Sequence, residues 1–164
     1  MQRGVVLVMG VLGSGKTTIG RLLAAALECR FIDADDYHST ANKQKMQRGE
    51  PLDDFDRAAW LEQLRGLIAG TLERGECAVL ACSALKEGYR ERLRVDPARV
   101  PMVYLKGSPQ LLAARIARRT EHFAKQSLLE SQLAALEEPS DAIVVDVAES
   151  PERIVERLRA LLQR

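Results

Sequence analysis

The stretch Gly10–Thr17 constrains the fold more than any other part of the chain. It reads G-V-L-G-S-G-K-T, which fits the pattern G-x-x-x-x-G-K-[ST], and it directly follows the apolar run Gly4–Met9. Glycines let the backbone turn so that successive N–H groups point at phosphate oxygens, and a following helix adds the positive end of its dipole. A glycine-rich turn without a ligand is the alternative. A match over all eight positions, in a strand-to-helix setting, favours a phosphate site.

Two side chains of this loop have expected tasks. Lys16 reaches the β and γ phosphates of a nucleotide, and the hydroxyl of Thr17 binds Mg²⁺. We therefore expect ATP as the phosphoryl donor, with Mg²⁺. The residues that we expect to bind it here are Gly10, Val11, Leu12, Gly13, Ser14, Gly15, Lys16, Thr17 and Thr18.

Apolar, β-branched runs alternate with stretches of helical periodicity along the whole chain, which predicts an α/β fold with a parallel sheet covered by helices. Serine followed by proline at Ser108 and at Ser150 predicts two helix starts, and Asp53 and Asp54 are suited to cap a long helix that ends near Gly75. The expected strands are Val5–Met9, Arg30–Asp33, Ala78–Ala81, Val100–Leu105 and Ala142–Val147.

Length and composition limit the domain organisation and the partners. With 164 residues, 46% of them hydrophobic, the chain fits one compact domain over 1–164. A net charge of +1 offers no field that would attract nucleic acid or an anionic membrane, so neither is an expected partner. Three cysteines without C-x-x-C spacing favour buried thiols in a reducing compartment over a disulfide framework. Because no apolar run approaches membrane-spanning length and the first strand leaves no room for a signal, we expect a cytoplasmic protein.

Acidic residues follow the second expected strand, at Asp33, Asp35 and Asp36. The carboxyl ends of parallel strands share one edge of the sheet, so this cluster should face the phosphate loop. Phosphoryl transfer to a small molecule needs one carboxylate near the hydrated Mg²⁺, here Asp33 through water, and another that orients or deprotonates the attacking hydroxyl, here Asp35. An acidic loop in solvent, with Asp36 capping a short helix, is the alternative.

Several motifs beyond the phosphate loop resemble the bacterial gluconokinases, and the match covers nearly the whole chain. The phosphate loop is shared by many nucleotide-binding proteins, whereas C-S-A-L-K and the pattern around it are far more particular. The matching segments are G-V-x-G-S-G-K-[ST] in 10–17, D-x-D-D-x-H in 33–38, N-x-x-K-M in 42–46, G-x-P-L-x-D-x-x-R-x-x-W-L in 49–61, C-S-A-L-K in 82–86, Y-R in 89–90, L-K-G in 105–107, R-x-x-x-R-x-x-H-F in 115–123 and L-E-E-P in 136–139.

The resemblance implies ATP-dependent phosphorylation of D-gluconate to 6-phospho-D-gluconate. It also implies a three-layer P-loop kinase fold of the nucleoside-monophosphate-kinase and shikimate-kinase type, with strand order 2-3-1-4-5, and a homodimer. Lys16, Asp35 and Arg119 are the expected catalytic residues. A lid near 118–127 is expected to close over the phosphates and exclude water. A helical segment near 36–74 is expected to bind the acceptor.

The acceptor is a polyol acid, whose carboxylate needs a cation and whose hydroxyls need short polar groups. Arg57 is the first candidate for the carboxylate, although it could instead pair with Asp53 or Asp54 on its own helix. His38 has two alternatives, a sugar hydroxyl or a neighbouring aspartate. The remaining candidates are Asp35, Lys45, Ser83 and Lys86 for the substrate, with Lys45 and Lys86 alternatively ordinary surface lysines, and Arg115 and Arg119 for ATP, with Arg118 as a substitute.

The sequence departs from the family pattern in three places. Leu12 replaces a small polar residue, Ala34 replaces a glycine, and Ala124-Lys125 replaces a residue such as Met followed by Pro. Neither of the first two changes removes a functional group, whereas the third makes the packing of the lid the least secure feature to carry over from the family.

Three other functions remain open from the sequence. A shikimate kinase usually carries a run of glycines where this chain has 83–86. The sequence does not distinguish a gluconate kinase from another sugar-acid or polyol kinase. A binding or regulatory module that hydrolyses ATP without an acceptor is opposed by the acidic cluster and by Arg57.

Overall fold

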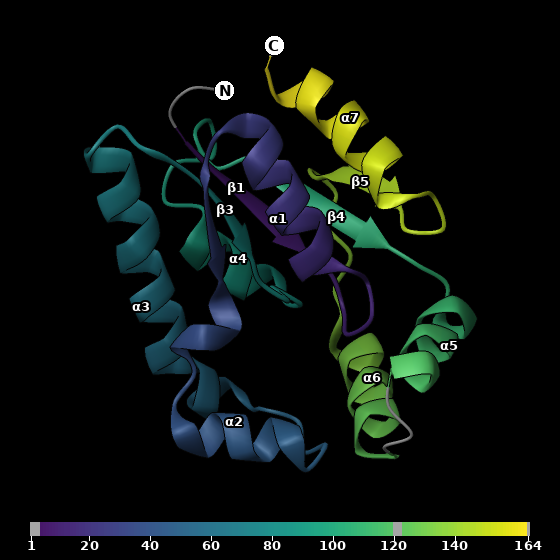
Figure 1. The fold of residues 1–164 in the computed structure, drawn as a ribbon. Coiled ribbons are helices and arrows are strands. Elements are labelled where there is room, and N and C mark those ends of the chain that lie inside the picture. Colours follow the sequence, from purple (N-terminus) through teal and green to yellow (C-terminus); the bar gives the residue numbers. More distant parts are fainter. Residues whose placement is uncertain (1–3, 120–122, 164) are drawn as a thin grey trace.

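The computed structural model describes residues 4–119 and 123–163, which form a five-stranded parallel sheet with helices on both faces (Figure 1). The strand order is β2-β3-β1-β4-β5, as predicted, and the bounds of β4 and β5 differ from the expected runs by one or two residues. The elements are β1 (Gly4–Met9), α1 (Lys16–Leu27), β2 (Arg30–Asp33), the 3₁₀ turn η1 (Ala34–Tyr37), α2 (Thr40–Gln47), α3 (Asp54–Glu73), β3 (Cys77–Ala81), α4 (Glu87–Leu93), β4 (Met102–Lys106), α5 (Pro109–Arg119), α6 (Phe123–Ala135), β5 (Ile143–Asp146) and α7 (Pro151–Leu162).

The helix starts follow the predicted capping chemistry. Asp53 and Asp56 form a reciprocal capping box at the start of α3, so two of the free backbone N–H groups there are satisfied. The hydroxyl of Ser108 accepts a hydrogen bond from the Leu111 amide, and that of Ser150 accepts one from the Arg153 amide. These local signals fix where the covering helices begin.

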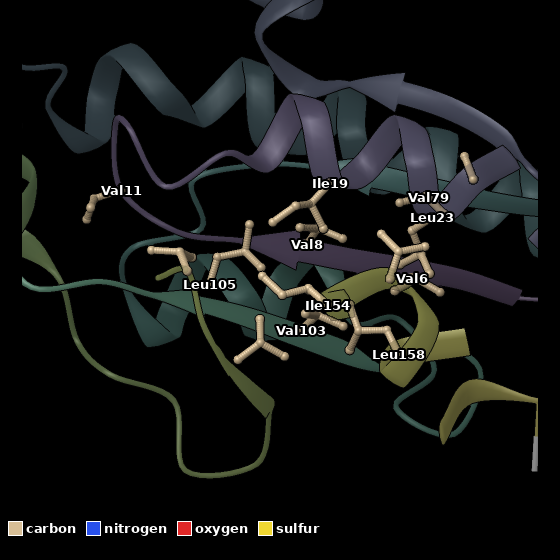
Figure 2. Close-up of a cluster of buried hydrophobic side chains, with 14 of the residues drawn as sticks. Val6, Val8, Val11, Ile19, Leu23, Val79, Val103, Leu105, Ile154 and Leu158 are labelled. Carbon is tan, nitrogen blue, oxygen red and sulfur yellow. The ribbon is translucent and has the colours of Figure 1, made fainter. Parts of the chain in front are cut away.

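Alternate residues of β1 pack into two separate hydrophobic cores. Val6 and Val8 pack with α1 and α7 on one face of the sheet (Figure 2). Leu7 and Met9 pack with α3 and α4 on the other face. Every residue of β1 is buried, so the strand that leads into the phosphate loop is rigidly held.

The cysteines correct one prediction. Cys29 and Cys77 are joined by a disulfide, and Cys82 is buried and free. The register of β2 and β3 explains the pairing, because Arg30 lies beside Ala78 and the preceding residues are therefore neighbours. The expectation of three unpaired thiols was wrong because it used spacing along the chain, whereas strand pairing brings residues 48 positions apart together.

The segment expected to form the lid is largely helical. Residues 118–119 end α5 and 123–127 begin α6, whereas 120–122 lie outside the described residues. The described part of the expected lid is therefore helical, and its closure over the phosphates stays a prediction. Within the described part of the chain, no helix is both long and apolar enough to cross a membrane.

Candidate active site

The loop after β1 forms a cradle of backbone N–H groups. Gly13 and Gly15 have φ values of +82° and +90°, which side chains other than glycine rarely adopt. A Cβ at Gly10 would lie 2.5 Å from the Ser14 hydroxyl oxygen, so only glycine fits there. Gly15 precedes α1 without a side-chain cap, which leaves the first amides of that helix available to an anion.

The hydroxyl of Ser14 is fully buried and has no hydrogen-bond partner among the residues that the structure describes. A buried polar atom without a partner costs free energy, so such an atom beside a cradle of backbone N–H groups fits a site that gains its partner from a ligand. The loop therefore has the geometry expected for nucleotide phosphates.

Lys16 begins α1 and its ammonium donates a hydrogen bond to the Val11 carbonyl oxygen at 3.1 Å. Burial lowers the pKa of Lys16 from its ordinary value, and the neighbouring Asp35 carboxylate opposes that shift. Among the described residues its one hydrogen-bond partner is this backbone carbonyl, which a desolvated cation can exchange for phosphate oxygens.

Thr17 and Asp33 lie together as expected for a Mg²⁺ site. The Thr17 hydroxyl donates to one carboxylate oxygen of Asp33 at 3.3 Å, and the other oxygen accepts from the Asp35 amide at 3.0 Å. No group of three metal-ligating side chains occurs among the described residues. One hydroxyl and one carboxylate nevertheless fit Mg²⁺, because this ion usually takes its remaining ligands from water and substrate phosphates.

A cavity of about 370 Å³, lined in part by residues of α2 and α6, opens beside the loop; we call it the α2–α6 cavity. Four cationic side chains line it, which suits an anionic ligand. Of these cations, only Lys16 and Arg57 are site candidates from the sequence, because Lys43 stands at an unspecified position of its motif and Lys125 follows the last matched residue of the lid motif. The lining residues are Leu12, Lys16, Asp35, Asp36, His38, Lys43, Met46, Gln47, Leu52, Arg57, Ser83, Lys125, Leu128 and Gln132.

Asp35 lines both this cavity and the cleft around the phosphate loop. Removal from water raises its pKa, Lys16 lowers it, and Asp33 and Asp36 raise it further. Its side chain is still 66% exposed, so water screens these effects. Asp35 therefore lies where a carboxylate would meet an acceptor hydroxyl and a phosphoryl group.

Arg57, on the first turn of α3, reaches the cavity with a guanidinium that hydrogen bonds to the Leu52 carbonyl oxygen. The same group lies over the Tyr89 ring at 5.4 Å and 3.5 Å from the Tyr89 hydroxyl. It forms no ion pair within 4 Å with Asp53 or Asp54, the alternative that the sequence left open; Asp54 pairs instead with Lys86.

The structure places Lys45 and Lys86 outside the lining of the α2–α6 cavity. Lys45 pairs with Asp56 at 2.9 Å, and Lys86 pairs with Asp54 at 3.1 Å. Both carboxylates belong to the start of α3, so each lysine helps to fasten another segment to that helix. Their expected contacts with the substrate stay predictions.

Ser83 does line the cavity, at the end of β3. The segment after it is fixed by Arg90, a buried side chain whose guanidinium donates hydrogen bonds to the carbonyl oxygens of Ala84 and Leu85 at 2.9 and 3.1 Å. Burial raises the pKa of Cys82 to about 12, so this thiol is not a nucleophile at neutral pH. Arg90 thus gives the Y-R motif a structural role that the sequence did not suggest.

Gln132 of α6 connects the two sides of the site. Its side-chain oxygen accepts a hydrogen bond from the Leu12 amide at 2.7 Å, across 120 positions of sequence. The helical corner of α5 and α6 is therefore attached directly to the phosphate loop.

A further cavity, of about 260 Å³, lies on the other side of the loop between α5 and the start of α7. We call it the arginine cavity because Arg115, Arg118 and Arg119 line it together with Thr18. Arg119 also lines the loop cleft, and Arg115 donates to the Val147 carbonyl oxygen. The α2–α6 cavity, the loop cleft and the arginine cavity thus share lining residues and run as one crevice across the carboxyl edge of the sheet.

Comparisons with known proteins agree with this geometry. The family model described as shikimate kinase matches residues 12–163. The gluconokinase of Arabidopsis thaliana is 43% identical over 92% of this chain and 88% of its own. A solved gluconokinase from Sinorhizobium meliloti 1021 is 39% identical with a TM-score of 0.85, over 98% of this chain and 96% of that one.

A solved sugar kinase from Janibacter sp. HTCC2649 has a TM-score of 0.90 and 41% identity, over 98% of this chain and 95% of that one. These similarities extend over the phosphate loop, the carboxylate cluster and the cavity between α2 and α6 alike. The chain is a P-loop kinase and belongs to the gluconokinase family.

Proposed function

We propose that this protein transfers the γ-phosphoryl group of ATP to the terminal hydroxyl of D-gluconate, with 6-phospho-D-gluconate and ADP as products. The single observation that carries the proposal is the position of Asp35, which borders both the phosphate loop and the α2–α6 cavity with its four cationic residues. The names of the similar proteins supply the choice of gluconate among acids of this size.

In the proposed reaction the substrate carboxylate binds Arg57, with Lys43 as a second cation. A guanidinium presents paired donors to a carboxylate, which fixes its orientation as well as its charge. The carbon chain then runs toward Asp35, past Ser83 and His38, so that the far hydroxyl lies nearest to the phosphate loop.

Transfer then proceeds by in-line displacement. Asp35 orients the terminal hydroxyl and accepts its proton, a bond forms between that oxygen and the γ-phosphorus, and the bond from the γ-phosphorus to the bridging oxygen of ADP breaks. The loop amides and Lys16 hold the phosphates, and Arg119 stabilises the charge on the transferring group. Thr17 and Asp33 would hold Mg²⁺, which neutralises phosphate charge when bound.

The arginine cavity is the proposed site for the nucleoside end of ATP. Its floor includes Gly15 and Thr18 of the loop, so a triphosphate bound in the cradle would direct its remaining part there. Arg115 and Arg119, which the sequence predicts to bind ATP, line this cavity, and their positions support the proposal. We further propose a homodimer, on the resemblance to the family alone, and a cytoplasmic location, as the sequence predicts.

The test is a panel of acceptors with MgATP, in which ADP formation and the phosphorylated product are both measured. The panel contains D-gluconate, two other aldonic acids, shikimate and an uncharged polyol of the same length. We expect transfer to gluconate at the terminal oxygen, located by ³¹P NMR, with little ADP formed in the absence of an acceptor. Faster turnover with shikimate, or ADP formation that is indifferent to every acceptor, would refute the proposal.

A further inference from the structure

His38 is buried between three groups that fix its position. Its side chain is 3% exposed, and its Nε2 atom lies 3.9 Å from a carboxylate oxygen of Asp35. One face of the imidazole stacks on Trp60, with ring centroids 4.1 Å apart and planes 16° from parallel. The ring is therefore held with one nitrogen toward the proposed base.

The other ring nitrogen faces Asn42. The amide nitrogen of Asn42 lies 2.7 Å from the Asp56 carbonyl oxygen and 3.4 Å from His38 Nδ1. A carbonyl oxygen only accepts hydrogen bonds, so the group facing it must be the NH₂ of Asn42. The second hydrogen of this NH₂ points to Nδ1, which must then be the acceptor. In a neutral imidazole the proton consequently lies on Nε2, the atom that faces Asp35.

Trp60 holds both ends of the turn that carries Asp35. Its indole N–H donates to the Ala34 carbonyl oxygen at 2.7 Å, while its ring packs on His38. Trp60 is 4% exposed and comes from the core of α3, so it is fixed more firmly than the turn itself. The carboxylate of Asp35, in contrast, is mostly exposed and needs an orienting partner.

We propose that Asn42, His38 and Trp60 orient Asp35 for catalysis: Asn42 sets the tautomer of His38, Trp60 fixes its plane, and the Nε2–H of His38 directs the Asp35 carboxylate at the acceptor hydroxyl. His38 is then a positioning residue rather than a ligand of a sugar hydroxyl. This inference rests on the proposed function insofar as Asp35 acts on an acceptor, but the tautomer of His38 does not depend on that function.

The charge state of His38 agrees with this role. Burial, followed by the nearby Arg57 and Lys43 cations, lowers its pKa to about 4. The imidazole is therefore neutral at pH 7, where a defined tautomer exists. The distance of 3.9 Å to Asp35 is longer than a hydrogen bond, and we expect it to shorten when the acceptor occupies the cavity.

The first test reads the tautomer directly in the whole protein. The chain has two histidines, so ¹⁵N-histidine labelling gives a simple spectrum, and His122→Gln assigns His38. We expect Nε2 protonated and Nδ1 unprotonated at pH 7. A protonated Nδ1 in the unaltered protein would overturn the proposal, whether or not gluconate proves to be the acceptor.

The second test changes the residue that sets the tautomer. Asn42→Asp replaces the NH₂ donor by an acceptor of the same shape, so a proton should move to Nδ1. Gln44→Glu introduces the same change of charge on an exposed position of α2 and serves as the matched control. We expect Asn42→Asp to lower kcat about tenfold or more with KM for gluconate within twofold, and Gln44→Glu to leave both unchanged.

Conservative replacements of His38 complete the test. The amide nitrogen of a glutamine can approach the position of Nε2, whereas that of an asparagine cannot, so His38→Gln should retain several times more kcat than His38→Asn. If either variant instead raises KM for gluconate with kcat unchanged, His38 binds the substrate and the positioning role is wrong. A fold defect is recognised because it would also weaken ATP binding.

Discussion

The loop cleft and the α2–α6 cavity hold their functional groups in different ways. The phosphate cradle of the cleft is made from backbone amides of one contiguous segment, and its unusual φ angles and buried Ser14 hydroxyl already have the form that a phosphate needs. The cavity is made from side chains of η1, α2, α3 and α6 and of the segments after β1 and β3. Two further cations near it are fastened to carboxylates of α3. The donor side is therefore preorganised by the chain itself, whereas the acceptor side depends on tertiary packing and on pairs that could rearrange.

Removal of Lys16 should have the largest effect and should act mainly on the donor side, although Lys16 also lines the α2–α6 cavity. Lys16→Met deletes the one ammonium at the cradle, so we expect kcat to fall by about 10³-fold. The measurement is gluconate-dependent ADP release, with ATP affinity determined separately by calorimetry. Lys106→Met, which removes an exposed lysine paired with Glu138, is the control and should change nothing. A rise in KM for gluconate as large as the loss of kcat would contradict the separation of the two sides.

Asp35 lies on the boundary between the loop cleft and the α2–α6 cavity. Asp35→Asn should lower kcat by about 10²-fold or more while ATP still binds. Asp36→Asn, at the neighbouring carboxylate, which is also exposed and lines the α2–α6 cavity but not the loop cleft, should cost less than about threefold in kcat. Because the folded state raises the pKa of Asp35, its ionised form is disfavoured by folding at neutral pH. The Asn variant should thus be no less stable than the parent in urea unfolding. A near-normal rate would remove Asp35 from the role of base.

Arg57→Lys tests the acceptor side alone. A lysine keeps the charge but loses the paired donors and the contact with the Tyr89 ring, so KM for gluconate should rise about 10- to 100-fold. Arg65→Lys, an exposed arginine two turns farther along α3, is the matched control. Unchanged KM in Arg57→Lys would show that Lys43 and Lys125 bind the carboxylate without it.

The protonation of His38 should also change how the free energy of unfolding depends on pH. Its pKa of about 4 lies below the unfolded value of about 6.5, so the unfolded chain takes up a proton that the folded chain does not. The resulting stabilisation is fully present above pH 6.5 and is lost as the pH falls toward 4. Between pH 7 and pH 5 the parent protein should lose about 2 kcal/mol more unfolding free energy than His38→Gln. Parallel losses in the two proteins would mean that His38 is not buried as a neutral group.

The same contrast explains what the sequence could predict. Phosphate binding, the capping serines and the acidic cluster are local, because each depends on residues within a few positions of one another. The strand order followed from family resemblance, and the Cys29–Cys77 pair required the register of two strands. Lys43, Lys125 and Gln132 were missed because nothing in their neighbouring sequence distinguishes them from surface residues of a helix. They become functional candidates only when α2 and α6 face each other in space.

Lys86 gives the smallest expected effect and the sharpest test of how the acceptor side works. The sequence motif suggests a substrate ligand, whereas the structure pairs Lys86 with Asp54, to which Tyr89 also donates a hydrogen bond. If this pairing persists during catalysis, Lys86→Gln should change KM for gluconate by less than about threefold, since an exposed ion pair contributes little free energy. Asp54→Asn separates the alternatives, because it releases Lys86 without removing it. An increase in KM for gluconate above tenfold in Lys86→Gln, together with a decrease in Asp54→Asn, would mean that the substrate carboxylate competes with Asp54 for this lysine. The acceptor side would then be assembled by the substrate, in contrast to the preformed loop cleft.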